Sequence, residues 1–204
     1  MSDAPPEGVA RLGRRTLPVI LPDLPSPETM PEFVGTPSGA GRRFAVVASR
    51  FNESITQPLA EGAVEALTRH GAEFADVDLI WVPGAWELPA AVRRALAIDR
   101  YDAIVAVGAV VRGETPHFDI VAGEAARGLA QAGADFDVPV TLGLLTTDTM
   151  EQAEARAGGA HGNKGWDAAL AALEMADLFA QLDAAADAEH ELAGGDAIRE
   201  GDEG

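Results

Sequence analysis

The chain of 204 residues contains no cysteine. This absence excludes disulfides, metal sites built on thiolates and a cysteine nucleophile, and it is compatible with the reducing cytoplasm, where we expect the protein to be located. No apolar run approaches the roughly 20 residues that are needed to span a bilayer. The first residues, Met1 to Pro6, lack the basic and then apolar order of a secretory signal.

Basic side chains are also scarce. The chain has 15 Lys and Arg residues against 33 Asp and Glu residues, and its formal net charge is −18. Such a charge repels phosphate backbones and anionic lipid surfaces, so we expect neither nucleic-acid nor membrane binding. An anionic ligand must then be held by a few local cations. The only lysine among the basic residues is Lys164.

Charge and proline content divide the chain into three segments. Residues 1–41 are rich in proline, which predicts an extended arm. Apolar residues of this arm could dock on a neighbouring surface; they are Leu17, Val19, Ile20, Leu21, Phe33 and Val34. Residues 183–204 hold eight acids and one Arg, which predicts a disordered acidic tail. Residues 42–182 remain, and they suffice for one compact domain.

Within residues 42–182, short apolar runs alternate with longer helical patterns. Strands that are apolar throughout suit a parallel sheet covered on both faces, so we predict an α/β fold with right-handed crossovers. The expected strands are 44–49, 77–82, 103–111 and 138–146, and the expected helices are 56–70, 87–98, 117–132, 150–156 and 166–182. Ligands of such sheets bind beyond the carboxyl ends of the strands.

Aromatic residues follow the first two predicted strands. Phe51, in Arg50-Phe51-Asn52, is either a ring folded back over the core or a stacking platform for a planar ligand. Small residues in Pro83-Gly84-Ala85-Trp86-Glu87 allow a ligand to approach the backbone. Glu87 either favours the start of a helix by its charge or binds a polyhydroxylated chain. The sequence does not separate these alternatives.

A glycine-containing loop, Gly108 to His117, follows the third strand. Such a loop before a helix offers free N–H donors to an anion, and Thr115 adds a hydroxyl. His117 would lie in the first helical turn, where the helix dipole favours the neutral imidazole that accepts a proton at pH 7. A surface role for His117 is the alternative.

After the fourth strand, a Gly-rich link carries two cations, Arg156 and Lys164. Two cations in an acidic chain suit a phosphate group, although Lys164 could simply be a solvated side chain in the first turn of a helix. The chain lacks a His pair four residues apart, a calcium loop, a nucleophile elbow and a phosphate-loop lysine, so we predict no metal site. General acid–base chemistry on a phosphorylated, ring-bearing ligand remains.

Taken together, these motifs resemble the 6,7-dimethyl-8-ribityllumazine synthase family of riboflavin biosynthesis. The resemblance covers roughly residues 42–182 and rests on order and spacing; its motifs are Arg50-Phe51-Asn52, Pro83 to Glu87, Gly108 to His117, Gly162-Asn163-Lys164-Gly165 and Ala172 to Ala176. It implies a flavodoxin-like, three-layer sandwich with a four-stranded parallel sheet. It also implies an enzyme, a transferase without metal or organic cofactor. This enzyme would condense 5-amino-6-(D-ribitylamino)uracil with 3,4-dihydroxy-2-butanone 4-phosphate, releasing phosphate and water.

The resemblance also implies roles for single residues. Phe51 would stack on the pyrimidine, His117 would transfer protons, and Arg156 would bind phosphate. The other implied contacts are Trp86 and Glu87 for the ribityl chain, Val110 and Val111 for the uracil, Glu114 and Thr115 for the phosphate, and Ala85, Leu142 and Lys164 elsewhere in the pocket. Lys164 would act electrostatically or structurally, because the family's imine forms on the substrate's own amine.

Two residues depart from the family pattern. Leu142 stands where many members have a Phe that reaches the site from the neighbouring subunit, and Ala160 stands where some have a further cation. The family's site lies between subunits of a pentamer, so we expect a homo-oligomer. Pentamer, decamer and a 60-subunit icosahedral shell stay open, although the short link from Gly158 to Gly162 favours the shell. Riboflavin synthase is a further expected partner.

Two alternative functions remain. One is a non-catalytic shell protein that binds flavin or lumazine; intact Phe51, His117 and Arg156 argue against it. The other is a flavodoxin-like electron carrier.

Overall fold

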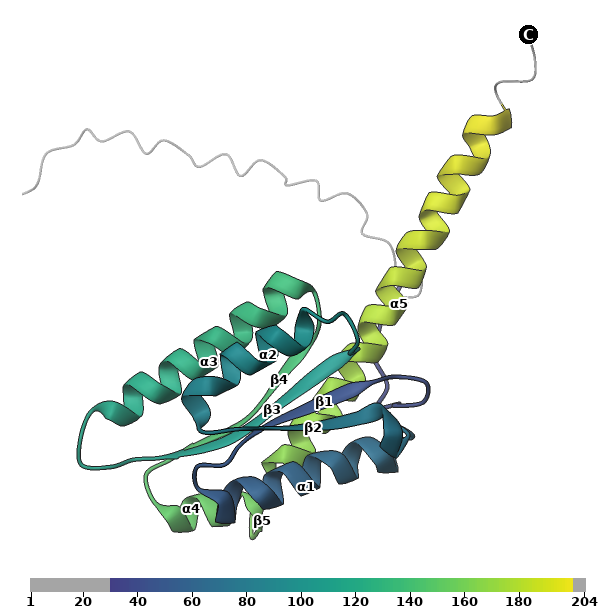
Figure 1. Ribbon diagram of the computed structural model, residues 1–204. Coiled ribbons are helices and arrows are strands. Elements are labelled where there is room, and N and C mark those ends of the chain that lie inside the picture. The colour runs from purple at the N-terminus through teal and green to yellow at the C-terminus, as the bar shows by residue number, and fades with distance from the viewer. Residues whose placement is uncertain (1–29, 200–204) are drawn as a thin grey trace, which may run out of the picture. The chain divides into compact units, whose positions relative to one another are not determined.

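Four parallel strands form the central sheet, in the order β2-β1-β3-β4 (Figure 1). The computed structural model describes residues 30–199. The strands are β1 (Phe44–Ser49), β2 (Val77–Val82), β3 (Ala103–Val111) and β4 (Val140–Thr147). All of β1 and most of β3 are buried, as expected for central strands that are covered on both faces.

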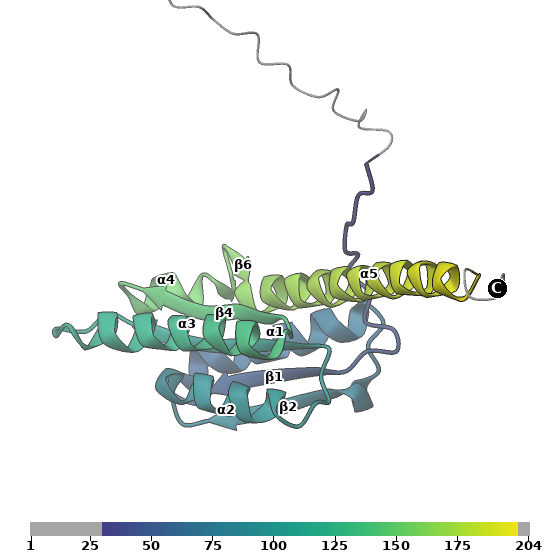
Figure 2. The same ribbon diagram turned by 90° about the horizontal axis from the view of Figure 1, so that it is seen from above.

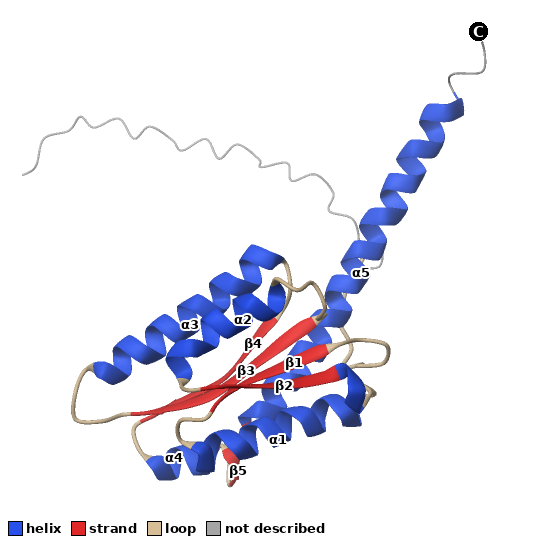
Figure 3. Ribbon diagram, viewed as in Figure 1, coloured by secondary structure: helices blue, strands red, loops and turns tan. Residues whose placement is uncertain are grey.

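Helices cover both faces of the sheet (Figure 3). On one face, α1 (Glu53–Arg69) and α5 (Lys164–Arg199) pack against Phe44 and Val46 of β1. On the other face, α2 (Leu88–Leu96) and α3 (His117–Phe136) pack against Ala45 and Val47. Successive side chains of a strand point to opposite faces, so a strand without polar positions serves two cores at once. The predicted three-layer α/β fold is confirmed.

Short elements complete the chain. Two single turns of 3₁₀-helix, η2 (Phe74–Asp76) and η3 (Ala85–Glu87), flank β2. After β4 come α4 (Met150–Glu154) and a small antiparallel hairpin made of β5 (Ala157–Gly159) and β6 (Gly162–Asn163). This hairpin leads directly into α5.

The sequence predicts the first three strands with their observed bounds, and the helix ends differ from the predictions. α1 begins at Glu53 rather than at Thr56, because Asn52 adopts a left-handed conformation (φ 61°) and its carbonyl accepts the first helical N–H bonds. α3 continues beyond Ala132 to Phe136 and ends at Asp137, which is also left-handed (φ 51°). Asn and Asp tolerate this conformation better than most residues.

The close packing of α1 on α5 depends on Asn163. Its side-chain oxygen accepts bonds from the N–H groups of Gly165 (2.9 Å) and Trp166 (3.2 Å), and its amide donates to the Pro58 carbonyl of α1 (2.7 Å). Asn163 thereby satisfies free donors at the start of α5 and ties both helices together. Gly62 of α1 leaves room for it, because a Cβ there would lie 2.7 Å from the Asn163 oxygen.

The segment before β1 is held by Asp177 of α5. The carboxylate accepts bonds from the backbone N–H of Thr36 (2.8 Å) and its hydroxyl (2.9 Å), from Arg42 (2.7 Å) and from Gln181 (2.9 Å). The Thr36 N–H bond and then the Arg42 guanidinium hold the pKa of the Asp177 carboxyl well below its usual range. Leu17, Val19, Ile20 and Leu21 of the predicted arm lie outside the described residues.

The last helix is longer than the sequence predicts. α5 continues past Leu182 to Arg199, in place of the predicted disorder, and extends beyond the sheet (Figure 2). Residues 183–188 include four alanines, which have the highest helix propensity, so the absence of bulky apolar residues does not end the helix. Residues 200–204 of the predicted tail lie outside the described residues.

Candidate active site

A cavity of about 370 Å³ lies at the carboxyl ends of β1 and β3, beside η3 and the start of α3. Seven of the predicted site residues line it: Phe51, Ala85, Trp86, Val110, Val111, Thr115 and His117. Asn52, Gly84, Ala109, Gly113, Phe118 and Val121 complete the lining. We refer to it as the first cavity. Its position follows the rule that ligands of parallel α/β sheets bind beyond the strand ends.

Two exposed aromatic rings line the first cavity. The Phe51 side chain is 69% exposed and that of Trp86 is 55% exposed, so Phe51 is not a ring folded back over the core. The loop that carries Phe51 is fixed by the end of β2, because the N–H groups of Arg50 and Phe51 donate to the carbonyls of Val82 (2.8 Å) and Pro83 (3.1 Å). Exposed rings on a fixed backbone suit the stacking of a planar ligand.

Asn52 also lines the first cavity, although it is not among the predicted site residues. Its amide donates to the carbonyl of Ala109 (3.0 Å), which joins the end of β1 to the end of β3 under the cavity. Its left-handed backbone also begins α1. The available signal was an Asn directly before a helix, because Asn adopts this conformation more readily than most residues.

Thr115 comes from the loop between β3 and α3, and His117 follows directly after this loop. His117 is the first residue of α3, follows Pro116, and is exposed to solvent on the cavity side. No side-chain hydrogen bond within the described residues fixes its ring. The imidazole is therefore accessible to a ligand and lies where the free N–H groups of a helix start favour an anion.

A second cavity, of about 480 Å³, lies along β4 and the first turns of α5. It contains the remaining predicted residues that line either cavity: Leu142, Arg156 and Lys164. Leu142 is 55% exposed. The β5–β6 hairpin brings the two cations together, since the Lys164 N–H donates to the Arg156 carbonyl (2.9 Å).

The two cations differ in their side-chain partners. Lys164 pairs with Asp167 (2.6 Å), whereas Arg156 donates only to the backbone carbonyl of Gln152 (2.9 Å) within the described residues. Among the described residues, no carboxylate compensates the charge of Arg156, so this charge is available to an anionic ligand. The charge of Lys164 is already compensated in part by Asp167. This arrangement favours Arg156 as the main phosphate-binding cation.

The two cavities share no lining residue. The first lies at the strand ends around β1 and β3, and the second lies along β4, the last strand of the sheet. Glu87, at the end of η3, and Glu114, exposed in the loop before α3, line neither cavity. Within one chain, the predicted phosphate-binding Arg156 and the predicted proton-transfer residue His117 therefore line different cavities.

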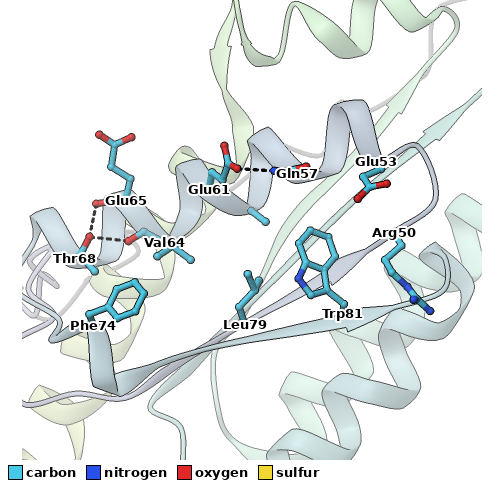
Figure 4. A pocket seen from close by; sticks show the side chains of 11 residues that line it. Arg50, Glu53, Gln57, Glu61, Val64, Glu65, Thr68, Phe74, Leu79 and Trp81 are labelled. Atoms are coloured by element: carbon cyan, nitrogen blue, oxygen red, sulfur yellow. Dashed lines mark hydrogen bonds between the residues drawn. The ribbon is translucent and has the colours of Figure 1, made fainter.

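A larger cavity, of about 810 Å³, contains none of the predicted site residues. It is a groove between α1 and β2 (Figure 4), in which Phe74, Leu79 and Trp81 lie opposite the polar side chains of α1. These three apolar side chains are 79%, 44% and 39% exposed. We refer to this surface as the α1–β2 groove.

Among residues 30–199, no group of three or more His, Asp or Glu side chains is placed to hold a metal ion. No helix in this part of the chain has the length and apolar character needed to cross a membrane.

The strand order β2-β1-β3-β4 defines a flavodoxin-like α/β protein, and the first cavity lies where proteins of this class bind small ligands. Residues 41–180 match the family described as 6,7-dimethyl-8-ribityllumazine synthase. The protein of that name from Gemmatimonas aurantiaca is 75% identical over 150 residues, which are 74% of this chain and 92% of the relative.

Two further proteins of the same name are also similar. That of Chlorobaculum tepidum is 51% identical over 148 residues, 72% of this chain and 96% of the relative. That of Aquifex aeolicus is 47% identical over 150 residues, 74% of this chain and 97% of the relative. The chain belongs to the 6,7-dimethyl-8-ribityllumazine synthase family, so the predicted family and enzyme class are confirmed.

Proposed function

We propose that this chain condenses 5-amino-6-(D-ribitylamino)uracil with 3,4-dihydroxy-2-butanone 4-phosphate, and that each complete site takes residues from two subunits of a homo-oligomer. One observation supports the shared site above all others. The ring-binding and proton-transfer residues line one cavity, whereas Arg156 and Lys164 line another with no residue in common. A second copy of the chain can supply Arg156 to the cavity that holds His117.

The chemistry of the first cavity supports binding of the uracil substrate. Phe51 provides an exposed ring for stacking, and the ends of β3 at Val110 and Val111 provide backbone groups for the polar edge of a pyrimidine. Trp86 covers the side where the ribityl chain would lie. His117, which begins α3, would move a proton during imine formation and phosphate release.

The phosphorylated substrate requires positive charge that the first cavity lacks. None of its lining residues is Lys or Arg, and Thr115 provides only a hydroxyl. Arg156 of a second subunit would supply the missing charge, and Lys164 would add to the local potential beside Asp167. Leu142 would close the pocket with an aliphatic side chain.

Exposed apolar surface supports self-association. In the α1–β2 groove, Leu79 and Trp81 belong to β2 and Phe74 to the preceding η2, and among the described residues β2 is an edge strand that pairs only with β1. Exposed aromatic side chains next to an unpaired strand edge are typical of a surface that another chain covers. Pentamer, decamer or 60-mer, a cytoplasmic location and riboflavin synthase as a partner stay predictions from the sequence.

Subunit mixing tests the shared site. His117→Ala should lower kcat by roughly ten- to a thousandfold, the loss expected for one acid–base group. Arg156→Ala should mainly raise the KM for the butanone phosphate. When equal amounts of the two variants are unfolded and refolded together, about a quarter of the interfaces should combine an intact first cavity with an intact second cavity. The rate of lumazine formation, followed by absorbance at a low concentration of butanone phosphate, should then rise toward about a quarter of the wild-type rate.

The matched control mixes His117→Ala with Phe51→Ala. Both substitutions lie in the first cavity, so no interface of this mixture has that cavity intact and the rate should not rise. An equal rise in both mixtures, or none in either, contradicts a site shared between subunits. A wild-type protein that forms no lumazine above the spontaneous rate contradicts the catalytic function and leaves a binding protein.

A further inference from the structure

Arg112 is the first residue of the loop between β3 and α3, which leads to His117, and none of the roles assigned above uses it. Its N–H donates to the Thr147 carbonyl (2.9 Å), which continues the pairing of β3 with β4. In an acidic chain, a 44% exposed arginine beside a candidate anion site would be the obvious phosphate ligand. The side-chain contacts of Arg112 indicate a different role.

The guanidinium of Arg112 contacts three side chains. It donates from Nε to Asp148 (2.8 Å) and from Nη1 to both oxygens of Asp119 (3.3 and 3.4 Å). Its central carbon lies 4.0 Å from the centre of the Phe118 ring, within the range of a cation–π contact. The hydrogen bond with Asp148 raises the pKa of Arg112 above its usual range. Two carboxylates already compensate the charge that a phosphate would need.

The residues that make these contacts lie on both sides of His117 in the sequence. Phe118 lines the first cavity directly after His117, and Asp119 is the acidic residue in the first turn of α3. Asp148 lies between β4 and α4. Arg112 therefore joins the first turn of α3 to the residue that follows β4, whereas His117 has no side-chain hydrogen bond of its own among the described residues.

We propose that Arg112 is a positioning residue that holds the start of α3, and with it His117, through Asp119, Asp148 and the Phe118 ring. It does not bind the phosphate of the substrate. This inference rests on the proposed function, because its measure is the rate of lumazine formation. A displacement of about 1 Å at a reacting group can cost roughly a hundredfold in rate, so the loss should fall on kcat.

The second cavity should be less affected by the loss of Arg112. α4 has a cap of its own, since the Thr149 hydroxyl accepts from the Gln152 N–H (3.3 Å), and Gln152 in turn holds Arg156 through its carbonyl (2.9 Å). Asp148 joins this end of α4 through its N–H, which donates to the Gln152 side chain (3.0 Å), so the Arg112 side chain should matter less to the phosphate-binding side than to His117. This difference predicts that kcat and the KM for the phosphorylated substrate respond differently.

The test compares Arg112→Met, which keeps length and removes charge, with Arg112→Lys, which keeps charge and loses the planar fork. We expect kcat of Arg112→Met to fall at least about tenfold while the KM for the butanone phosphate stays within about twofold, because alignment is lost and phosphate binding is kept. Arg112→Lys should lie between Arg112→Met and the wild type. It also serves if Arg112→Met fails to fold, as judged by circular dichroism and sedimentation.

Arg93 offers a matched control at the other end of α3. It pairs with Asp135 (2.6 Å) and lies 5.5 Å from the Phe136 ring, so Arg93→Met removes the same kinds of contact far from His117. Its kcat and KM should equal those of the wild type. A raised KM with unchanged kcat in the Arg112 variants would make Arg112 a phosphate ligand and overturn the proposal. Unchanged values of both would do so too, and an inactive wild type would instead refute the proposed function.

Discussion

The substitution Gly165→Ala tests the packing that places the second cavity. Gly165 is buried in the first turn of α5, where the helix meets the backbone of α1. A Cβ at this position would lie 2.7 Å from the Leu59 carbonyl carbon and 3.0 Å from its Cα, and closer still to the carbonyl oxygen. Ordinary contacts begin at 3.4 Å, so α5 must move away from α1.

The expected cost combines two effects of opposite sign. Overpacking a tight contact costs typically about 1–3 kcal/mol, and more where backbone must move, as it must here. Replacing Gly by Ala in a helix returns at most about 1 kcal/mol. We therefore expect a net loss of about 2 kcal/mol in the free energy of unfolding, and a fall in Tm of about 4–8 °C for a domain of this size. Because Lys164 precedes Gly165, the KM for the butanone phosphate should also rise.

The assay is thermal unfolding followed by circular dichroism, with all samples at one protein concentration because association shifts Tm. Gly123→Ala is the control. Gly123 lies inside α3, and a Cβ there would meet no heavy atom of the chain within 4 Å, so this variant should be as stable as the wild type or more so. A Gly165→Ala protein that melts with the wild type would refute the close approach of α1 and α5.

Two further predictions concern titration. Burial and the hydrogen bond to Asp78 raise the pKa of Tyr101 to about 12. Because Tyr101 is the only tyrosine, absorbance at 295 nm follows it alone, and Asp78→Asn should lower its midpoint; an unchanged midpoint contradicts the contact. The stability that the neutral phenol contributes is present below the unfolded pKa of about 10 and should be lost as pH rises toward 12. The lowered pKa of Asp177 has the opposite sign. Its carboxylate should stabilise the fold above about pH 4 and lose that effect in acid, so Asp177→Asn should lower Tm at pH 7 more than at pH 3. Equal losses at both pH values would contradict this.

The sheet could be predicted from the sequence because its central strands are unambiguous. Phe44–Ser49 and Ala103–Val111 contain almost no polar side chain, and such runs are stable only when both faces are covered. Helix ends were harder, because single residues decide them. Asn52 and Asp137 adopt left-handed conformations that a pattern of apolar residues does not reveal.

Residues that line the first cavity could be predicted where chemistry and strand ends coincide, as at Phe51, Trp86 and His117, and their roles in the reaction stay predictions. In the motif Gly162-Asn163-Lys164-Gly165, the sequence suggests a ligand for Lys164 alone, and in the structure Asn163 and Gly165 shape the contact between α1 and α5. The sequence offers no signal for this contact, because it depends on which helix lies opposite. Phe118 was missed for a similar reason, since its neighbour Arg112 becomes visible only in three dimensions.

The separation of the two cavities determines how many complete sites an assembly of a given number of subunits contains. In the proposed assembly each contact joins two different surfaces, so the interface is heterologous, and such contacts run head to tail until a ring closes. An open row always leaves one first cavity and one second cavity without a counterpart at its ends. Only a closed ring gives as many complete sites as subunits, so loss of a single subunit from the ring would remove two sites.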